Sequence, residues 1–230
     1  MRPSKKLKDK TKITYKPDYE GLSINTGKFN NLGVYTTMLK PMSGQIKALL
    51  TYHSRIALLM FELHLPVTEL MPASSSNLDV TKFFKQIKED LSSSVWGNQK
   101  HVIHFWAIEN GTSKNGHYHC MIGFSSTVRV GTFYTAPSTF AWELLERRWN
   151  EISGGSLNGS KCHIVNRSNQ KEFSDAFEHL SYICKTRDKV FGTGEHHKRY
   201  SASRLKHNKG TIQLSITDHQ PESVKDCVAA

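Results

Sequence analysis

The order of apolar patterns along the chain constrains its fold more than any other feature of the sequence. Residues 55–66 form an apolar run that ends at Pro66, which predicts a strand. Residues 79–94 predict an amphipathic helix, because their apolar side chains recur with the period of a helix: Val80, Phe83, Phe84, Ile87 and Leu91.

Two more predicted strands, 101–109 and 117–124, are separated by Asn, Gly and Ser residues that are typical of a hairpin turn. A second helix at 138–153, a short strand at 161–167 and a third helix at 171–187 complete the pattern. This order, β-α-β-β-α-β-α, predicts an α+β fold in which helices pack on a central antiparallel sheet.

The sequence divides into three segments. Residues 1–54 read as a basic N-terminal arm and a helical lead-in, 55–210 as the main domain, and 211–230 as a tail that we expect to be flexible. Within the lead-in, residues 41–54 predict a helix with Ser43 as its N-cap.

The charge of the chain points to a polyanionic partner. The formal net charge is +11 and the sequence pI is about 9.5. Such a charge favours nucleic acid first and a membrane surface second, whereas the simplest alternative is a basic protein that its charge keeps soluble. No run of apolar residues is long enough to span a bilayer, so no membrane partner is expected.

The cysteines and the N-terminus predict a cytoplasmic protein with reduced thiols. No Cys-x-x-Cys pair or zinc-finger spacing occurs, and the basic N-terminal residues lack the apolar stretch of a signal peptide. The four cysteines are therefore interpreted as small buried apolar residues.

A His-x-His pair, His117 and His119, is the first candidate for chemistry. Residues two apart in a strand project from one face, so both imidazoles can reach one divalent metal ion. Glu109 ends the neighbouring strand of the predicted hairpin and is the expected third ligand, with His179 as the alternative. With 12 histidines in the chain, two partly exposed strand histidines without a metal are the competing interpretation.

A Tyr-x-x-Lys pair on the third helix is the second candidate. Tyr182 and Lys185 lie at positions i and i+3, so they share a face of the predicted helix. A tyrosine attacks a phosphorus centre only if its phenolate is favoured, and a neighbouring ammonium group favours it. In isolation such a pair is more often a surface tyrosine beside a solvated lysine.

Three blocks in this order resemble the HUH endonucleases, and more closely the YagK/YfjJ-type family of inovirus replication initiators. "FELHLP" (61–66) is similar to the first strand of that family. "FWAIENGTSKNGHYHCMIGF" (105–124) is similar to its Trp-x-x-Glu…His-Tyr-His block, and "HLSYICKTRDKVFGTG" (179–194) to its Tyr-x-x-Lys helix. The resemblance covers roughly residues 55–195.

The resemblance implies a ferredoxin-like (RRM-like) HUH endonuclease domain at 55–210. It implies a metal site at His117, His119 and Glu109 for Mg²⁺ or Mn²⁺, with Tyr182 as nucleophile and Lys185 as its helper. The implied reaction nicks single-stranded DNA at an origin and starts rolling-circle replication, with a host helicase and polymerase as partners. Four basic side chains are expected to contact the DNA: Lys114, Arg187, Lys198 and Arg199.

Three other classes of protein share parts of this pattern. Relaxases and single-tyrosine transposases perform the same chemistry as replication initiators. A non-haem iron oxygenase also uses two histidines and one carboxylate, but the basic charge disfavours it. A DNA-binding regulator that keeps the fold and no longer cleaves is a third class.

Overall fold

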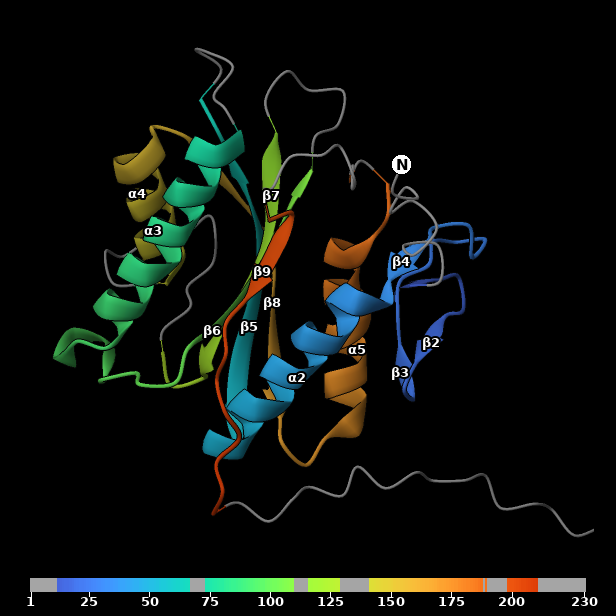
Figure 1. The fold of residues 1–230 in the computed structure, drawn as a ribbon. Helices are drawn as coiled ribbons and strands as arrows, with labels where there is room; N and C mark the ends of the chain where they lie inside the picture. The colour runs from blue at the N-terminus through green and yellow to red at the C-terminus, as the bar shows by residue number, and fades with distance from the viewer. Residues whose placement is uncertain are drawn as a thin grey trace, which may run out of the picture.

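Helices cover both faces of a central antiparallel sheet in this α+β protein (Figure 1). The computed structural model describes residues 12–66, 73–109, 116–128, 141–187, 189 and 198–210. The elements are β1 (Ile13–Thr14), β2 (Asp18–Tyr19), β3 (Leu22–Ser23), β4 (Val34–Tyr35), α2 (Thr36–Tyr52), β5 (Arg55–His64), α3 (Ala73–Leu91), η2 (Ser94–Trp96), β6 (Ile103–Glu109), β7 (His117–Ser125), α4 (Ala141–Ser153), β8 (Ser156–Asn166), α5 (Gln170–Ser181), η3 (Tyr182–Cys184) and β9 (Tyr200–Ala202).

The central sheet has five strands in the order β8-β5-β7-β6-β9, and every neighbouring pair is antiparallel. The segment from β5 to β8 runs β-α-β-β-α-β, which is the ferredoxin-like arrangement, and β9 adds a further edge strand next to β6. The predicted α+β fold with a central antiparallel sheet is confirmed.

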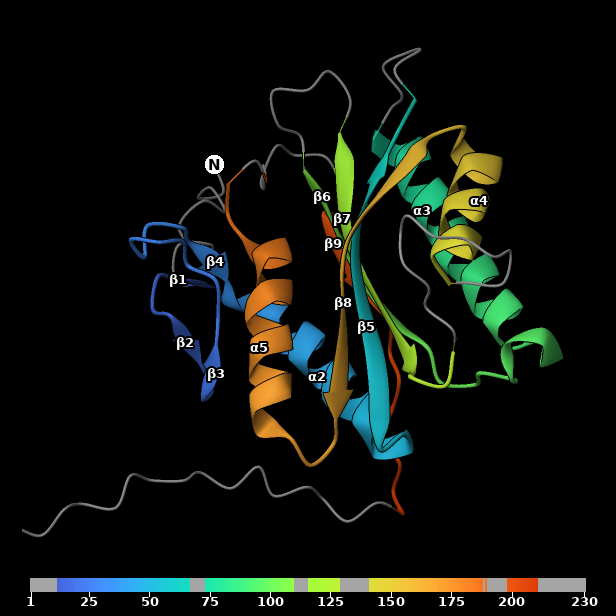
Figure 2. The same ribbon diagram turned by 180° about the vertical axis from the view of Figure 1, so that it is seen from behind.

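Each face of the sheet has its own hydrophobic core. Helices α3 and α4 cover one face, and α2 and α5 cover the other (Figure 2). Because both faces are covered, β5 is buried almost continuously and reads as an apolar run without alternation. Trp106, Trp142 and Trp149 are buried in the core on the side of α3 and α4.

Helix α2 begins earlier than the sequence predicts, and the assignment of Ser43 as its N-cap is wrong. The helix starts at Thr36, so Pro41 lies inside it and Ser43 is buried within it. A proline has no N–H to donate to the carbonyl four residues before it, here that of Thr37. The hydroxyl of Tyr200 on β9 donates to that carbonyl at 3.3 Å, which compensates for the missing helical bond.

The described residues ahead of β5, from 12 onward, pack with the main domain. Side chains of α2 pack in the same core as the sheet and α5, although the sequence placed residues 36–52 in a separate lead-in. Ahead of α2, the described chain forms two small two-stranded sheets, β1–β4 and β2–β3, which the sequence did not predict. The tail at 211–230 lies outside the described residues.

In the described parts of the chain, no helix is both long and apolar enough to cross a membrane. Cys120 and Cys184 are buried and Cys162 is half-buried, and these three described cysteines are free thiols. Their burial agrees with their interpretation as small apolar residues.

Candidate metal centre and nucleophile

Strand pairing gathers five polar side chains on one face at one end of the sheet. Strand β7 lies between β5 and β6, and His117 and His119 project from the same face of β7. Glu62 and His64 of β5 stand opposite His119 and His117, and Glu109 of β6 stands opposite His117. Residues directly opposite in an antiparallel pair share a face, so all five converge.

Two histidines and a carboxylate form a group that could hold a metal ion. The Nε2 atoms of His117 and His119 are 3.1 Å apart, and His119 Nδ1 is 3.2 Å from Glu62 Oε1. One ligand atom from each of these three residues lies within 4.8 Å of the others. Ligand atoms bound to one divalent ion at about 2.1 Å stand roughly 3 Å apart, so the spacing of the two Nε2 atoms suits a shared divalent ion.

His64 extends this group on the side of β5. Its ring stacks on that of His117 with centroids 5.2 Å apart, and its Nε2 lies 3.2 Å from Glu62 Oε2. That contact with His64 lowers the pKa of Glu62, against an opposing effect of burial. Burial and the neighbouring His119 lower the pKa of His117, so both groups favour the neutral imidazole and ionised carboxylate that bind metals.

Glu109 lies beside the histidines but is also paired with two buried lysines. Its Oε2 is 3.1 Å from His119 Nε2 and 3.2 Å from Lys185 Nζ, and its Oε1 accepts from Lys189 Nζ at 2.5 Å. Burial raises the pKa of Glu109, but the His119 contact and the charge of Lys189 outweigh it and lower that pKa to about 2. Burial lowers the pKa of Lys189, and Glu109 opposes that effect.

Helix α5 brings the tyrosine to the same place. Asn169 caps its first turn by accepting from the N–H of Glu172 at 3.1 Å, and Phe173 and Phe177 bury its apolar face against the sheet. The α-helix ends at Ser181, earlier than the sequence predicts.

Tyr182 and Lys185 meet in the tight 3-10 turn that follows α5. Lys185 Nζ donates to Tyr182 Oη at 2.7 Å and lies 4.0 Å from the centroid of the Tyr182 ring. The Tyr182 ring meets that of His119 edge to face, with centroids 5.8 Å apart. Lys185 is 3% exposed, so the alternative of a solvated lysine on a surface helix is wrong for this pair.

The third ligand to a metal has two candidates in this structure. Glu109 was the expected ligand, and its Oε2 lies 3.9 Å from His117 Nε2 and closer to His119. Both of its oxygens already face ammonium groups, whereas the described partners of Glu62 are imidazoles. A divalent cation therefore meets less repulsion from neighbouring positive charges at Glu62 than at Glu109. The assignment of Glu109 as the third ligand stays a prediction.

His179 is separated from the metal group. Its Nδ1 lies 2.9 Å from His163 Nε2, where α5 packs on the edge strand β8. Among the residues that the structure describes, the three-residue group at Glu62, His117 and His119 does not include it. The alternative of His179 as third ligand is therefore not supported by the geometry.

Sequence reasoning missed three members of the site: Glu62, His64 and Lys189. Glu62 and His64 are two residues apart in an otherwise apolar strand, which is the same signal that singled out His117 and His119. Lys189 lies in an irregular stretch of the chain with no period to place it.

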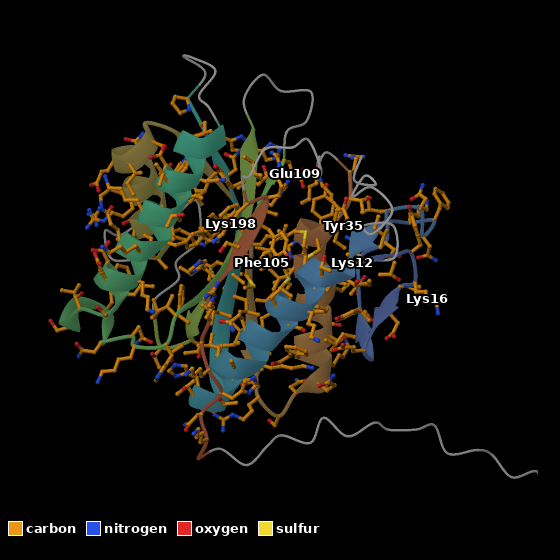
Figure 3. The ribbon with its side chains drawn as sticks, viewed as in Figure 1. Lys12, Lys16, Tyr35, Phe105, Glu109 and Lys198 are labelled. Atoms are coloured by element: carbon orange, nitrogen blue, oxygen red, sulfur yellow. The ribbon has the colours of Figure 1, made fainter. Side chains whose placement is uncertain are left out.

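The expected DNA contacts are placed in part. Lys198 and Arg187 are exposed, and Arg199 precedes β9, where its carbonyl accepts from the N–H of Ile108 at 3.0 Å. That bond sets Lys198 and Arg199 beside the end of β6 that carries Glu109 (Figure 3). Lys114 lies outside the described residues.

A protein-family model matches most of the chain. The YagK/YfjJ C-terminal domain matches residues 21–201, which include β5 to β8, the first two residues of β9 and all the residues of the site. The chain belongs to this family. The YagK/YfjJ C-terminal domain therefore starts well before β5 and includes α2. No curated protein and no solved structure matches the chain closely enough to count as a relative.

Proposed function

We propose that this YagK/YfjJ-family protein nicks and rejoins single-stranded DNA through a 5′-phosphotyrosyl link at Tyr182, as HUH endonucleases do. In this proposal it initiates rolling-circle replication of a filamentous phage or a related element. The supporting observation is a continuous path of polar contacts from Tyr182 Oη through Lys185 Nζ and Glu109 Oε2 to His119 Nε2.

The path suits attack on a phosphodiester. Tyr182 Oη forms a bond to phosphorus while the bond from phosphorus to the 3′ oxygen breaks. The phenol proton passes to solvent, and the departing 3′ oxygen takes a proton from solvent, so charge and atoms balance. Lys185 stabilises negative charge on Tyr182 Oη before the bond forms, and the reaction reverses when the freed 3′-OH attacks the phosphotyrosine.

His117 and His119, together with Glu62 or Glu109, would hold the divalent ion. When bound, the ion supplies electrostatic stabilisation of the charge on the non-bridging phosphate oxygens. His64 packs against His117 and holds one side of this group in place through its contact with Glu62.

Covalent trapping tests the proposal. The protein is incubated with labelled single strands that tile the replicon encoding it, in Mg²⁺ or Mn²⁺, and is then run on a denaturing gel. We expect a protein–DNA adduct that Tyr182→Phe abolishes and His119→Ala strongly reduces. Tyr52→Phe is the matched control and should leave the adduct intact, because Tyr52 ends α2 and stacks on His101, ahead of the end of β6 opposite to Glu109.

Two results would contradict the proposal. An adduct that persists in Tyr182→Phe removes the assigned nucleophile. Binding of the strands without any cleavage by the unmodified protein supports the regulator reading instead. If cleavage is found, extension of the freed 3′ end by a host polymerase in the presence of a helicase distinguishes replication from transposition, because the cleavage itself is the same in both.

A further inference from the structure

The stretch ahead of α2 is attached directly to the segment that carries the proposed nucleophile. Val34 of β4 forms an isolated antiparallel bridge with Lys185, and the N–H of Thr186 donates to the carbonyl of Gly33 at 2.7 Å. Strand β4, and β1 that pairs with it, are therefore held against the turn that contains Tyr182 and Lys185.

Tyr15 sits at this junction. A Cβ added at Gly33 would lie 3.1 Å from the Cζ atom of the Tyr15 ring and 3.1 Å from Thr186 Oγ1. The backbone at Gly33 thus lies between the ring of Tyr15 and Thr186, the residue that follows Lys185. Although one side of its ring is supported in this way, Tyr15 is 55% exposed.

Exposed aromatic side chains gather in residues 12–35. Within the described ranges, four large apolar residues are exposed, and the two aromatic ones, Tyr15 and Phe29, both lie here. Lys28 Nζ stands 5.5 Å from the centre of the Phe29 ring, and Lys16 follows Tyr15. Aromatic rings beside cationic side chains are the composition of a surface that binds unpaired nucleotides.

The rings of Tyr15 and Phe29 are exposed, although the protein has two large cores in which other aromatic residues are buried. Every base has a π-face, so a supported, half-open tyrosine can stack with any base of a single strand. Lys12, where the described chain begins, accepts a hydrogen bond from Thr36 through its carbonyl and is itself exposed (Figure 3). Its ammonium group is available to a phosphate.

We propose that Tyr15 is a stacking contact for an unpaired base of the DNA strand next to the scissile phosphate, with Lys12 and Lys16 contacting the backbone. The subsite deepens the proposed function and rests on it for the position of the strand. Tyr15 precedes residues 21–201, so the family match assigns it no role.

Equilibrium binding tests the subsite without cleavage. The full-length protein is titrated in EDTA against a fluorescein-labelled thymidine 20-mer and against a duplex of equal length, with fluorescence anisotropy as the readout. We expect Tyr15→Ala to weaken binding of the single strand about tenfold and to leave duplex binding within about twofold. Tyr15→Trp should keep the single-strand affinity.

Matched controls separate stacking from folding. Val95→Ala removes an even more exposed apolar side chain from η2, far along the chain from Tyr15, and should change neither affinity. An unchanged single-strand affinity in Tyr15→Ala overturns the subsite. Equal losses for single strand and duplex overturn it as well, because a stacked base must be unpaired.

Photocrosslinking fixes the position of the contact. A strand carrying 5-iododeoxyuridine is irradiated with the protein, and the crosslinked peptide is identified by mass spectrometry. A crosslink at Tyr15 supports the subsite, and crosslinks confined to peptides outside 12–35 overturn it. If covalent trapping fails while Tyr15 still crosslinks, the nicking function is wrong and the binding surface remains.

Discussion

Lys185 Nζ lies 2.7 Å from Tyr182 Oη and 3.2 Å from Glu109 Oε2, so one ammonium group joins the proposed nucleophile to the carboxylate beside the histidine pair. A buried lysine held between these two oxygens is oriented from both sides. The tyrosine and the histidines are therefore coupled even though they lie on elements far apart in the sequence.

Replacing Lys185 should slow cleavage much more than it weakens binding. Lys185→Met keeps most of the side-chain volume and removes the only described cation that contacts Tyr182 Oη. We expect the rate of adduct formation to fall about 10²- to 10³-fold, the range found when one donor to a developing negative charge is lost. Lys171→Met, an exposed lysine at the start of α5, should have no effect.

Lys189 should contribute mainly to stability. Its side chain is fully buried and pairs with Glu109 Oε1, so Lys189→Met leaves a buried carboxylate with one cation fewer. We expect the free energy of unfolding in urea to fall by about 3 kcal/mol. The double variant Glu109→Gln, Lys189→Met should recover part of that loss, and a double variant less stable than Lys189→Met alone would contradict a pairwise role.

The third metal ligand can be decided by comparing two amide variants. If Glu62 is the ligand, Glu62→Gln should weaken Mn²⁺ binding about tenfold or more in isothermal titration calorimetry, because the site loses a charged donor. Glu109→Gln should then change the affinity less. The reverse order would restore Glu109 as the ligand, and Glu178→Gln, on the exposed side of α5, is the control.

The order of elements could be predicted from the sequence because it depends on local patterns. A strand whose two faces are both covered by helices consists mostly of apolar residues. In a helix with one buried face, apolar residues recur about every 3.6 positions. Helix ends were less predictable. Pro41 looked like a start because a proline inside a helix is unusual. The donor that Pro41 cannot offer to the carbonyl of Thr37 is supplied by the hydroxyl of Tyr200, which is 159 residues from Pro41 in the chain.

The site was predictable only where its residues repeat a short spacing. His117 and His119 are two residues apart in a predicted strand, and Tyr182 and Lys185 are three residues apart in a predicted helix, so each pair shares a face. Glu62 joins them through the register of β5 against β7, and Lys189 through its ion pair with Glu109. The strand register and the ion pair both join residues far apart in the chain, so no local sequence pattern predicts them.

Loss of the hydrogen bond between Tyr200 and α2 should lower the stability of the protein measurably. Tyr200→Phe removes the hydroxyl that satisfies the carbonyl of Thr37, and we expect a loss of about 1 kcal/mol in the free energy of unfolding. In a Pro41→Ala background the helix regains its own N–H donor, so the same substitution should cost less. Equal costs in both backgrounds would show that Tyr200 acts through packing.

Stability should fall in mild acid because of His104. Its ring stacks on Phe84 with centroids 4.4 Å apart, and burial, with a smaller effect of Lys88, lowers the pKa of His104 from 6.5 to about 4. Between these two values the unfolded chain binds a proton that the folded protein does not. Stability is therefore complete above pH 6.5 and is lost as the pH falls towards 4, by at most about 1.4 kcal/mol per pH unit for one proton.

Removing the imidazole should reduce this sensitivity. His104→Gln cannot take up the proton, so its melting temperature should change less between pH 7 and pH 5 than that of the unmodified protein. His207→Gln, at an exposed position, should keep the original pH dependence. Because His104 faces α3 and not the metal group, adduct formation at pH 7 should be unchanged in His104→Gln, which separates a stability effect from a loss of chemistry.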